Sequence, residues 1–212
     1  MKNPDDFIIT RKRKKYKFAK FANSPLCFEL DEWQKQAVDV LEVGAGTGLF
    51  SVELAQRHRE LQFVAIDVKG DRLQTGAYEA ASLGLTNVRF VRARADQLDQ
   101  IVPEKSLQQI WVTFADPYPK KRSAGRRMTH PTFLRLYERI LSGIGGLYIK
   151  HDNPVFFAWT LEQLVNEKWQ LDELTFDLHD SELSSDYKVL TTYEKRWLGE
   201  GLKTQLVRAH KG

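Results

Sequence analysis

Short apolar runs alternate along most of this chain with longer stretches in which apolar residues recur every three or four positions. Runs of the first kind are typical of buried strands, and stretches of the second kind are typical of helices that pack on a sheet. We expect seven strands, at residues 38–43, 63–67, 88–91, 109–114, 147–150, 174–178 and 202–208. We expect helices between them, at residues 32–37, 49–55, 73–83, 132–141 and 155–169.

The strand-helix order repeats through most of the chain, and this order predicts the fold class. Parallel strands need long crossovers between them, usually helical, and such crossovers are right-handed. The sequence therefore predicts an α/β protein with a doubly wound, mostly parallel sheet of seven strands and helices on both faces. We expect one domain at residues 26–212, preceded by a basic N-terminal arm at residues 1–25.

The net charge of +4 is spread unevenly over the 212 residues. Residues 1–24 hold eight basic and two acidic residues, and residues 117–134 hold five basic residues and no acid. Concentrated basic segments on an acidic body attract a polyanion locally, although a solvated arm and a charged loop are the simpler alternative. Aromatic residues among the lysines of the arm suit stacking on bases as well as packing in a core: Tyr16, Phe18 and Phe21.

A single cysteine, Cys27, rules out a disulfide within the chain, and the sequence has no cluster of Cys and His with zinc-ligand spacing. This favours a reducing compartment, the cytoplasm, and predicts no bound metal. Residues 1–25 lack the apolar segment of a secretion signal, and no apolar run approaches the ~20 residues that a membrane span needs. We therefore expect neither secretion nor membrane insertion.

The turn after the predicted strand at residues 38–43 contains three glycines, Gly44, Gly46 and Gly48. Glycines between a strand and a helix let the backbone approach a ligand closely, and Asp67 at the end of the next strand can accept hydrogen bonds from ribose hydroxyls. A simple tight turn would need one glycine rather than three. A nicotinamide cofactor would require Gly or Ala at the position of Leu49, which disfavours an oxidoreductase.

The stretch Glu-Val-Gly-Ala-Gly-Thr-Gly at residues 42–48 instead resembles the first motif of S-adenosylmethionine (AdoMet) methyltransferases. This resemblance implies AdoMet as the cofactor and a Rossmann-like class I methyltransferase fold whose last strand is antiparallel. Glu42 beside the turn is an acid suited to a cationic ligand. In that fold the position of Asp96, after the third strand, usually contacts adenine.

The most specific segment is Phe-Ala-Asp-Pro-Tyr-Pro-Lys-Lys-Arg at residues 114–122. Pro117 and Pro119 restrict its backbone, so that Asp116 and Tyr118 can be held over the cofactor cleft with little entropy left to lose. The alternative is an ordinary Asp-Pro turn followed by a solvated loop. The basic side chains that follow can bind phosphates, and they are Lys120, Lys121, Arg122, Arg126 and Arg127.

Four matches make the chain resemble the tRNA (guanine-N7-)-methyltransferases, which modify guanosine 46 in the variable loop. These matches are residues 41–48, residues 114–122 with the trailing Arg126 and Arg127, Asp152 after a strand, and Thr-Thr-Tyr-Glu at residues 191–194 with Arg196. The family usually has tryptophan where Tyr118 stands, often histidine where Ser123 stands, and frequently glutamate where Asp67 stands. We expect Tyr118 still to stack, and the loss of a ring at Ser123 to alter contact with RNA.

The resemblance implies a role for each matched residue. Cofactor binding is expected at the glycine turn and at Glu42, Asp67, Asp96 and Asp116. Substrate binding is expected at Lys120, Asp152, Thr191, Thr192, Tyr193 and Glu194, and contact with tRNA at Lys121, Arg122, Arg126 and Arg127. Among the five histidines, we expect only His151, beside Asp152, near the cleft.

The chemistry of guanine N7 bears on which residues are needed. N7 already exposes a lone pair, so its methylation needs no strong general base, and we expect positioning and electrostatics to supply the catalysis. Asp116 is our candidate catalytic residue. Asp152 and Glu194 are our candidates for the guanine N1 and N2 groups, because these are donors and an ionised carboxylate only accepts.

Two other functions stay open from the sequence. One is an AdoMet-dependent N6-adenine or other amino methyltransferase that acts on RNA, and the other is a non-catalytic RNA-binding module with the same fold. The leading hypothesis is transfer of a methyl group from AdoMet to N7 of guanosine in tRNA. The sequence favours neither a monomer nor a homodimer.

Overall fold

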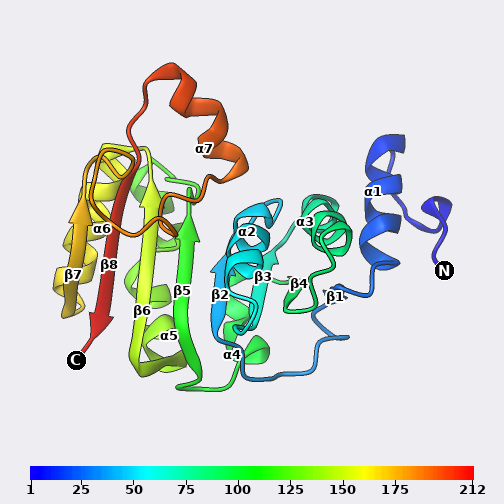
Figure 1. Ribbon diagram of the computed structural model, residues 1–212, viewed down its shortest axis with the longest axis horizontal. Helices are drawn as coiled ribbons and strands as arrows, with labels where there is room; N and C mark the ends of the chain where they lie inside the picture. Colours follow the sequence, from blue (N-terminus) through cyan, green and yellow to red (C-terminus); the bar gives the residue numbers. More distant parts are fainter.

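An eight-stranded sheet with the strand order β1-β4-β3-β2-β5-β6-β8-β7 forms the centre of the molecule (Figure 1). The computed structural model describes residues 1–212, except for the side chains of Arg196 and Trp197. The strands are β1 (Cys27–Glu29), β2 (Val40–Val43), β3 (Phe63–Asp67), β4 (Val88–Arg92), β5 (Leu107–Thr113), β6 (Leu141–His151), β7 (Trp169–Thr175) and β8 (Gln205–Lys211). Strands β1 to β6 pair in parallel, and β8 is antiparallel to both of its neighbours, β6 and β7.

The sheet confirms the predicted α/β class, the mostly parallel pairing and the antiparallel last strand. It has one strand more than the seven expected, because the short strand β1 adds to the edge of the sheet beside β4. Near the other edge, the predicted strand at residues 174–178 is replaced by β7, at Trp169–Thr175. Lys168 adopts a left-handed φ of 60° just after α6, and this residue ends the helical path so that β7 begins at once.

Helices cover both faces of the sheet. They are α1 (Lys12–Ala22), α2 (Leu49–Arg57), α3 (Gly70–Ser82), α4 (Leu98–Ile101), α5 (Pro131–Ile140), α6 (Pro154–Asn166) and α7 (Thr192–Trp197), with short 3-10 helices at η1 (Pro4–Asp6), η2 (Ala95–Gln97), η3 (Lys121–Arg126) and η4 (Leu198–Glu200). Helices α1, α2 and α3 supply apolar side chains to one core, and α4, α5 and α6 supply them to the other. No helix in the described part of the chain is long and apolar enough to cross a membrane.

The helix expected at residues 32–37 is absent, and this prediction is wrong. The segment runs as an irregular connection, and Trp33 is buried with its indole Nε1 donating a hydrogen bond to the carbonyl oxygen of Ile101 at 2.9 Å. A six-residue stretch gains little from helix formation alone, so the burial of one large ring decides its path.

The basic arm contains a helix that is joined to the rest of the fold. In α1, Ala19 and Phe21 are buried, and the Phe21 ring packs against Gly70 at the start of α3. Tyr16 is exposed, and the Phe18 ring lies 5.3 Å from the Arg92 guanidinium. Of Tyr16, Phe18 and Phe21, Phe21 therefore belongs to the core.

The carboxyl ends of the parallel strands meet along one edge of the sheet, and α7 lies beyond them at the top of Figure 1. β7 is antiparallel to β8 and β8 is antiparallel to β6, so β7 ends at this same edge, and residues 176–191 lead from the end of β7 to α7. Ligands in open α/β sheets bind at this edge.

Candidate cofactor and substrate site

The turn between β2 and α2 has a left-handed backbone at each of its three glycines, with φ values of 74°, 58° and 71° at Gly44, Gly46 and Gly48. A Cβ atom on Gly48 would lie 2.6 Å from the Phe90 ring, so this glycine is needed for packing. A Cβ atom on Gly46 would meet nothing within 4 Å, so this glycine leaves open space above the turn. The two glycines therefore serve different purposes.

A cavity of about 640 Å³ lies against this turn, which is a size typical of sites for small ligands. It is bounded by the glycine turn, the end of β5, the first turn of α7, the start of α3 and one residue of α1. The lining residues are Lys17, Gly44, Ala45, Gly46, Thr47, Lys69, Arg72, Thr75, Thr113, Phe114, Asp116, Thr191, Thr192 and Tyr193. Four segments distant in sequence thus converge on the glycine turn.

Asp67 fixes the shape of the turn from the end of β3. Its two carboxylate oxygens accept hydrogen bonds from the backbone N–H groups of Gly46 at 2.9 Å and Lys69 at 2.8 Å. Both of these neighbours line the cavity, so Asp67 lies at its margin. The side chain expected to bind ribose thus also orders the backbone that would surround the ligand.

Glu42 is placed differently from the expectation, because its side chain is 1% exposed and does not line the cavity. Its carboxylate accepts hydrogen bonds from the hydroxyls of Ser51 at 2.6 Å and Thr113 at 2.9 Å. Burial raises the pKa of Glu42 to about 7, against the opposing effect of these hydrogen bonds. In this structure Glu42 joins α2 to β5 beneath the site.

Asp96 also lies outside the residues that line the cavity. Its exposed carboxylate pairs with the guanidinium of Arg94, with Nε and Oδ1 2.9 Å apart. Of the acids expected around the cofactor, only Asp116 contributes directly to the wall of this cavity.

A second cavity, of about 320 Å³, adjoins the first and shares Phe114, Asp116 and Tyr193 with it. Its other walls come from the segment after β5, from the end of β6 through the start of α6, and from one residue shortly before β8. They are formed by Ala115, Pro117, His151, Asp152, Asn153, Pro154 and Leu202. The structure therefore brings Asp116 and Asp152 to one pocket, with Asp116 at the junction of the two cavities.

The backbone between β5 and the basic segment is strained. Phe114 and Tyr118 have φ values of 49° and 38°, a region that side chains other than glycine rarely adopt. Such residues persist only where the surrounding structure holds them, and they cluster at functional sites. The prolines predicted a stiff segment here, and the structure adds strain on either side of Asp116.

His151 links Asp152 to Ala115, the residue that precedes Asp116. It is buried, and its Nε2 donates a hydrogen bond to the carbonyl oxygen of Ala115 at 2.8 Å, while its Nδ1 lies 3.1 Å from Oδ1 of Asp152. Burial would raise the pKa of Asp152, but its interactions with His151 and a hydrogen bond from Tyr193 outweigh burial and lower that pKa. Asp152 is therefore an ionised acceptor at neutral pH, and the expectation that His151 lies near the cleft is confirmed.

The basic side chains after Pro119 divide into two kinds. Lys120, Lys121, Arg122 and Arg126 are exposed, and the Arg126 guanidinium lies 4.7 Å from the centre of the Tyr118 ring. Arg127 is half-buried, donates hydrogen bonds to the carbonyl oxygens of Pro117 and Tyr118, and stacks 4.2 Å from the Trp159 ring. The exposed residues can meet a polyanion, whereas Arg127 braces the strained segment.

Residues 191–193 form a lip of the first cavity. Thr191 caps α7, with its hydroxyl accepting a hydrogen bond from the backbone N–H of Glu194 at 3.0 Å. The hydroxyl of Thr192 lies 2.8 Å from that of Thr47, and the Tyr193 ring packs 5.3 Å from that of Phe114. Three of the four residues expected here to bind substrate therefore reach the site.

The interpretation of Glu194 as a partner of the guanine edge is not supported by its position. Its side chain is 1% exposed, lines neither cavity, and accepts hydrogen bonds from Lys150 and Thr204. Both oxygens of this carboxylate already accept hydrogen bonds inside the protein, so neither is available to the N1 and N2 groups of guanine. The neighbouring Arg196, part of the same motif, lies outside the described side chains.

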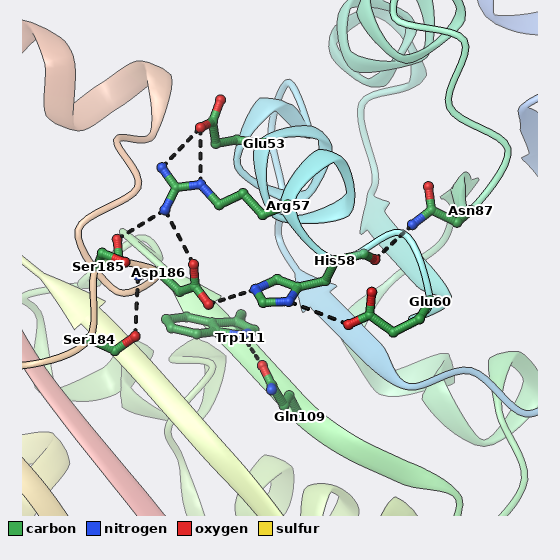
Figure 2. Close-up of polar contacts among 10 residues, drawn as sticks. All are labelled: Glu53, Arg57, His58, Glu60, Asn87, Gln109, Trp111, Ser184, Ser185 and Asp186. Atoms are coloured by element: carbon green, nitrogen blue, oxygen red, sulfur yellow. Dashed lines mark hydrogen bonds and ion pairs between the residues drawn. The ribbon is translucent and has the colours of Figure 1, made fainter.

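The segment that leads to α7 is anchored on α2 (Figure 2). Asp186 accepts a hydrogen bond from Arg57 at 3.2 Å, and its other oxygen lies 2.7 Å from Nε2 of His58. Figure 2 shows Asp186 between these two side chains, with the carbonyl oxygen of Ser185 also accepting from Arg57 at 3.3 Å. These contacts hold residues 184–186 against the end of α2.

Several residues of the site were missed by sequence reasoning. Thr47 lies within the glycine motif, and Thr113 ends β5 directly before the segment at residues 114–122, so these positions were the available signal. The cations Lys17, Lys69 and Arg72 line the first cavity from α1 and the start of α3, and no local pattern marks them. Lys150 ends an apolar strand, and a charge at such a position indicates a buried partner.

Known proteins with similar folds are methyltransferases. The structure matches a 16S rRNA methyltransferase, KamB, with a TM-score of 0.61 and 15% identity, covering 85% of this chain and 89% of the other. It also matches a SAM-dependent methyltransferase from Aquifex aeolicus, with a TM-score of 0.55 and 17% identity over 82% of each chain. The fold is therefore that of the class I AdoMet-dependent methyltransferases.

Sequence comparison identifies the family. Residues 36–206 match the family model described as "Putative methyltransferase". A tRNA (guanine-N(7)-)-methyltransferase of Brevibacillus brevis is 34% identical, covering 80% of this chain and 78% of its own, and one of Bacteroides fragilis is 32% identical, covering 93% and 85%. The chain belongs to the tRNA (guanine-N(7)-)-methyltransferase family.

Proposed function

We propose that this protein transfers a methyl group from AdoMet to N7 of guanosine in tRNA, at position 46 of the variable loop. The observation that carries the proposal is the pair of adjoining cavities that meet at Asp116. One lies on the glycine turn, and the other lies between Asp116 and Asp152. The relatives named as tRNA (guanine-N(7)-)-methyltransferases support the choice of substrate.

The residues around the first cavity fit AdoMet. The space above Gly46 is open, and the left-handed backbone of the turn lets a ligand approach closely. Asp67 and Asp116 would hold polar and cationic parts of the cofactor, and Lys17, Lys69 and Arg72 supply positive charge for its carboxylate. When bound, AdoMet supplies an electrophilic methyl group on a sulfonium, and the transfer needs no metal.

The protein's own contribution is to place and stabilise the base. Guanine N7 needs no proton removed, so a general base is unnecessary. Asp152 accepts hydrogen bonds from the N1 and N2 groups of guanine, because its low pKa keeps it ionised. Asp116 stabilises the positive charge that shifts to the purine, from its position at the junction of the cavities.

The exposed basic segment would hold the tRNA near this pocket. Lys121, Arg122 and Arg126 would bind phosphates, which gives affinity without base identity. The basic arm at residues 1–25 would add to the same attraction, and Lys17 of this arm lines the first cavity. We place the reaction in the cytoplasm.

The proposal is tested by incubating the purified protein with labelled AdoMet and unmodified tRNA, followed by nucleoside analysis. We expect label in 7-methylguanosine, and loss of that label when guanosine 46 is replaced. Label only in N6-methyladenosine would identify an amino methyltransferase instead. Binding of tRNA without any affinity for AdoMet in calorimetry would identify a non-catalytic RNA-binding module.

A further inference from the structure

A buried ion pair lies directly beneath the lip of the first cavity. Lys150, at the carboxyl end of β6, is fully buried, and its Nζ lies 2.9 Å from Oε2 of Glu194. Oε1 of Glu194 accepts a hydrogen bond from Thr204 at 3.0 Å and lies 2.7 Å from Nε2 of His179. Each oxygen of this carboxylate therefore has partners inside the protein.

Lys150 connects Glu194 to the rest of the site. Its ammonium donates a second hydrogen bond to the carbonyl oxygen of Val189 at 2.9 Å and lies 5.3 Å from the Phe50 ring of α2. Its own carbonyl oxygen accepts a hydrogen bond from the N–H of Phe114 at 2.9 Å. One residue thus joins α2, the strained end of β5 and the segment that enters α7.

Glu194 in turn determines where α7 begins. Its Oε2 accepts a hydrogen bond from the backbone N–H of Thr191 at 3.1 Å, and the Thr191 hydroxyl accepts one from the N–H of Glu194. This reciprocal arrangement is a capping box. It orders the residues that form the lip of the cavity, Thr191, Thr192 and Tyr193.

Burying two charges is costly, and such a pair contributes little net stability compared with apolar side chains of similar size. The pair instead fixes the positions of the segments that carry it, because each buried charge is stabilised only with its partner in one place. We propose that Lys150 and Glu194 are positioning residues that hold the first turn of α7 against the cofactor cavity, and that Glu194 does not contact the target base. This inference rests on the proposed function.

The first experiment measures AdoMet affinity by calorimetry, without turnover. Glu194→Gln keeps the shape of the side chain but removes its charge, and we expect the AdoMet Kd to rise about tenfold. Glu200→Gln changes an exposed acid in η4, just beyond α7, and should leave the Kd unchanged. An unchanged Kd in a folded Glu194→Gln protein overturns the inference.

A gentler variant keeps the test valid if Glu194→Gln does not fold. Thr204 is buried, lines neither cavity and donates to Glu194. Thr204→Val removes this hydrogen bond and should raise the AdoMet Kd about threefold, while Thr204→Ser should restore it. Equal values for the Val and Ser variants overturn the inference.

The second experiment separates positioning from direct contact with the base, using tRNA that carries inosine at the target position. Inosine lacks the 2-amino group of guanosine. If Glu194 only positions α7, the fold losses in kcat/KM from inosine and from Glu194→Gln multiply when the variant acts on the inosine tRNA. If Glu194 binds the amino group, the variant acting on the inosine tRNA loses no more than either change alone causes. Absence of 7-methylguanosine with wild-type protein would instead overturn the proposed function, whereas the AdoMet Kd would still test the positioning role.

Discussion

The side-chain hydroxyls of Thr47 and Thr192 lie 2.8 Å apart, although 145 residues separate them along the chain. Thr47 belongs to the glycine turn, and Thr192 is the first residue of α7. Both line the first cavity. This hydrogen bond therefore closes the ring of segments around the proposed cofactor.

We predict that Thr192→Val and Thr47→Val each weaken AdoMet binding severalfold, because each leaves the other hydroxyl without its partner. The double variant should bind about as well as either single variant, since one shared hydrogen bond is lost in all three. Calorimetry on the four proteins measures the coupling, with Thr192→Ser as the control that keeps the hydroxyl. Fully additive losses would show that the two residues act independently.

The glycine turn offers a matched pair of substitutions. In Gly48→Ala the new Cβ would lie 2.6 Å from Phe90, in addition to the left-handed backbone, so we expect a loss of about 2–4 kcal/mol in the free energy of unfolding. In Gly46→Ala only the backbone is strained, which costs about 1–2 kcal/mol. The new methyl group would instead occupy the cofactor cavity, so AdoMet affinity should fall. Urea denaturation measures the loss of stability, and calorimetry measures the AdoMet affinity. Equal losses of stability in the two variants would contradict the packing role given to Gly48.

Asp116 lies at the junction of the two cavities, so its charge should matter most for turnover. We predict that Asp116→Asn lowers kcat by about 10²- to 10³-fold, the usual cost of removing one preorganised electrostatic group. Binding of tRNA, measured by filter retention, should persist. A variant that keeps the wild-type rate would exclude the role given to Asp116.

Arg122 and Arg127 should behave differently although both belong to the basic segment. Arg122 is exposed, so Arg122→Ala should reduce the slope of log affinity for tRNA against log salt by about 0.7–0.9. Arg127 donates to the carbonyl oxygens of Pro117 and Tyr118, so Arg127→Ala should leave that slope unchanged and lower kcat by loosening the segment around Asp116. Titrations at several salt concentrations test both statements. A change of slope in Arg127→Ala would indicate direct contact with phosphate.

The raised pKa of Glu42 predicts a pH-dependent stability. The folded protein binds a proton at Glu42 with a pKa of about 7, above the ordinary value of 4.5 for a glutamate, so protonated Glu42 stabilises the fold at low pH. That contribution is lost as the pH rises from about 4.5 to about 7. Glu42→Gln is neutral throughout, so it should gain stability relative to wild type over this range, by up to about 3 kcal/mol. Urea denaturation at pH 5 and pH 8 measures the difference in the free energy of unfolding between Glu42→Gln and wild type. The same difference at both pH values would contradict the raised pKa of Glu42.

Much of the fold follows from local pattern. The apolar runs predicted β2 to β6 and β8, whereas the strand predicted at residues 174–178 shares only its first two residues with β7. β1 was missed because Cys27–Glu29 is too short to show a period. The helix expected at residues 32–37 is absent, because burial of Trp33 decides the path of this segment. Propensity over so few residues is weaker than the burial of one large ring.

The sequence by itself determined the strand-turn-helix that carries Gly44 to Gly48 and the place of Asp116 after a strand, because parallel strands end at one edge and their end residues must meet there. Only the tertiary structure decided which acids face that edge. Glu42 and Glu194 have the same chemistry as Asp152, yet distant partners, Thr113 for one and Lys150 for the other, hold them in the interior. A carboxylate is available to a ligand only if donors of the protein do not already surround it. Those donors come from elements distant in sequence, which no local pattern can place.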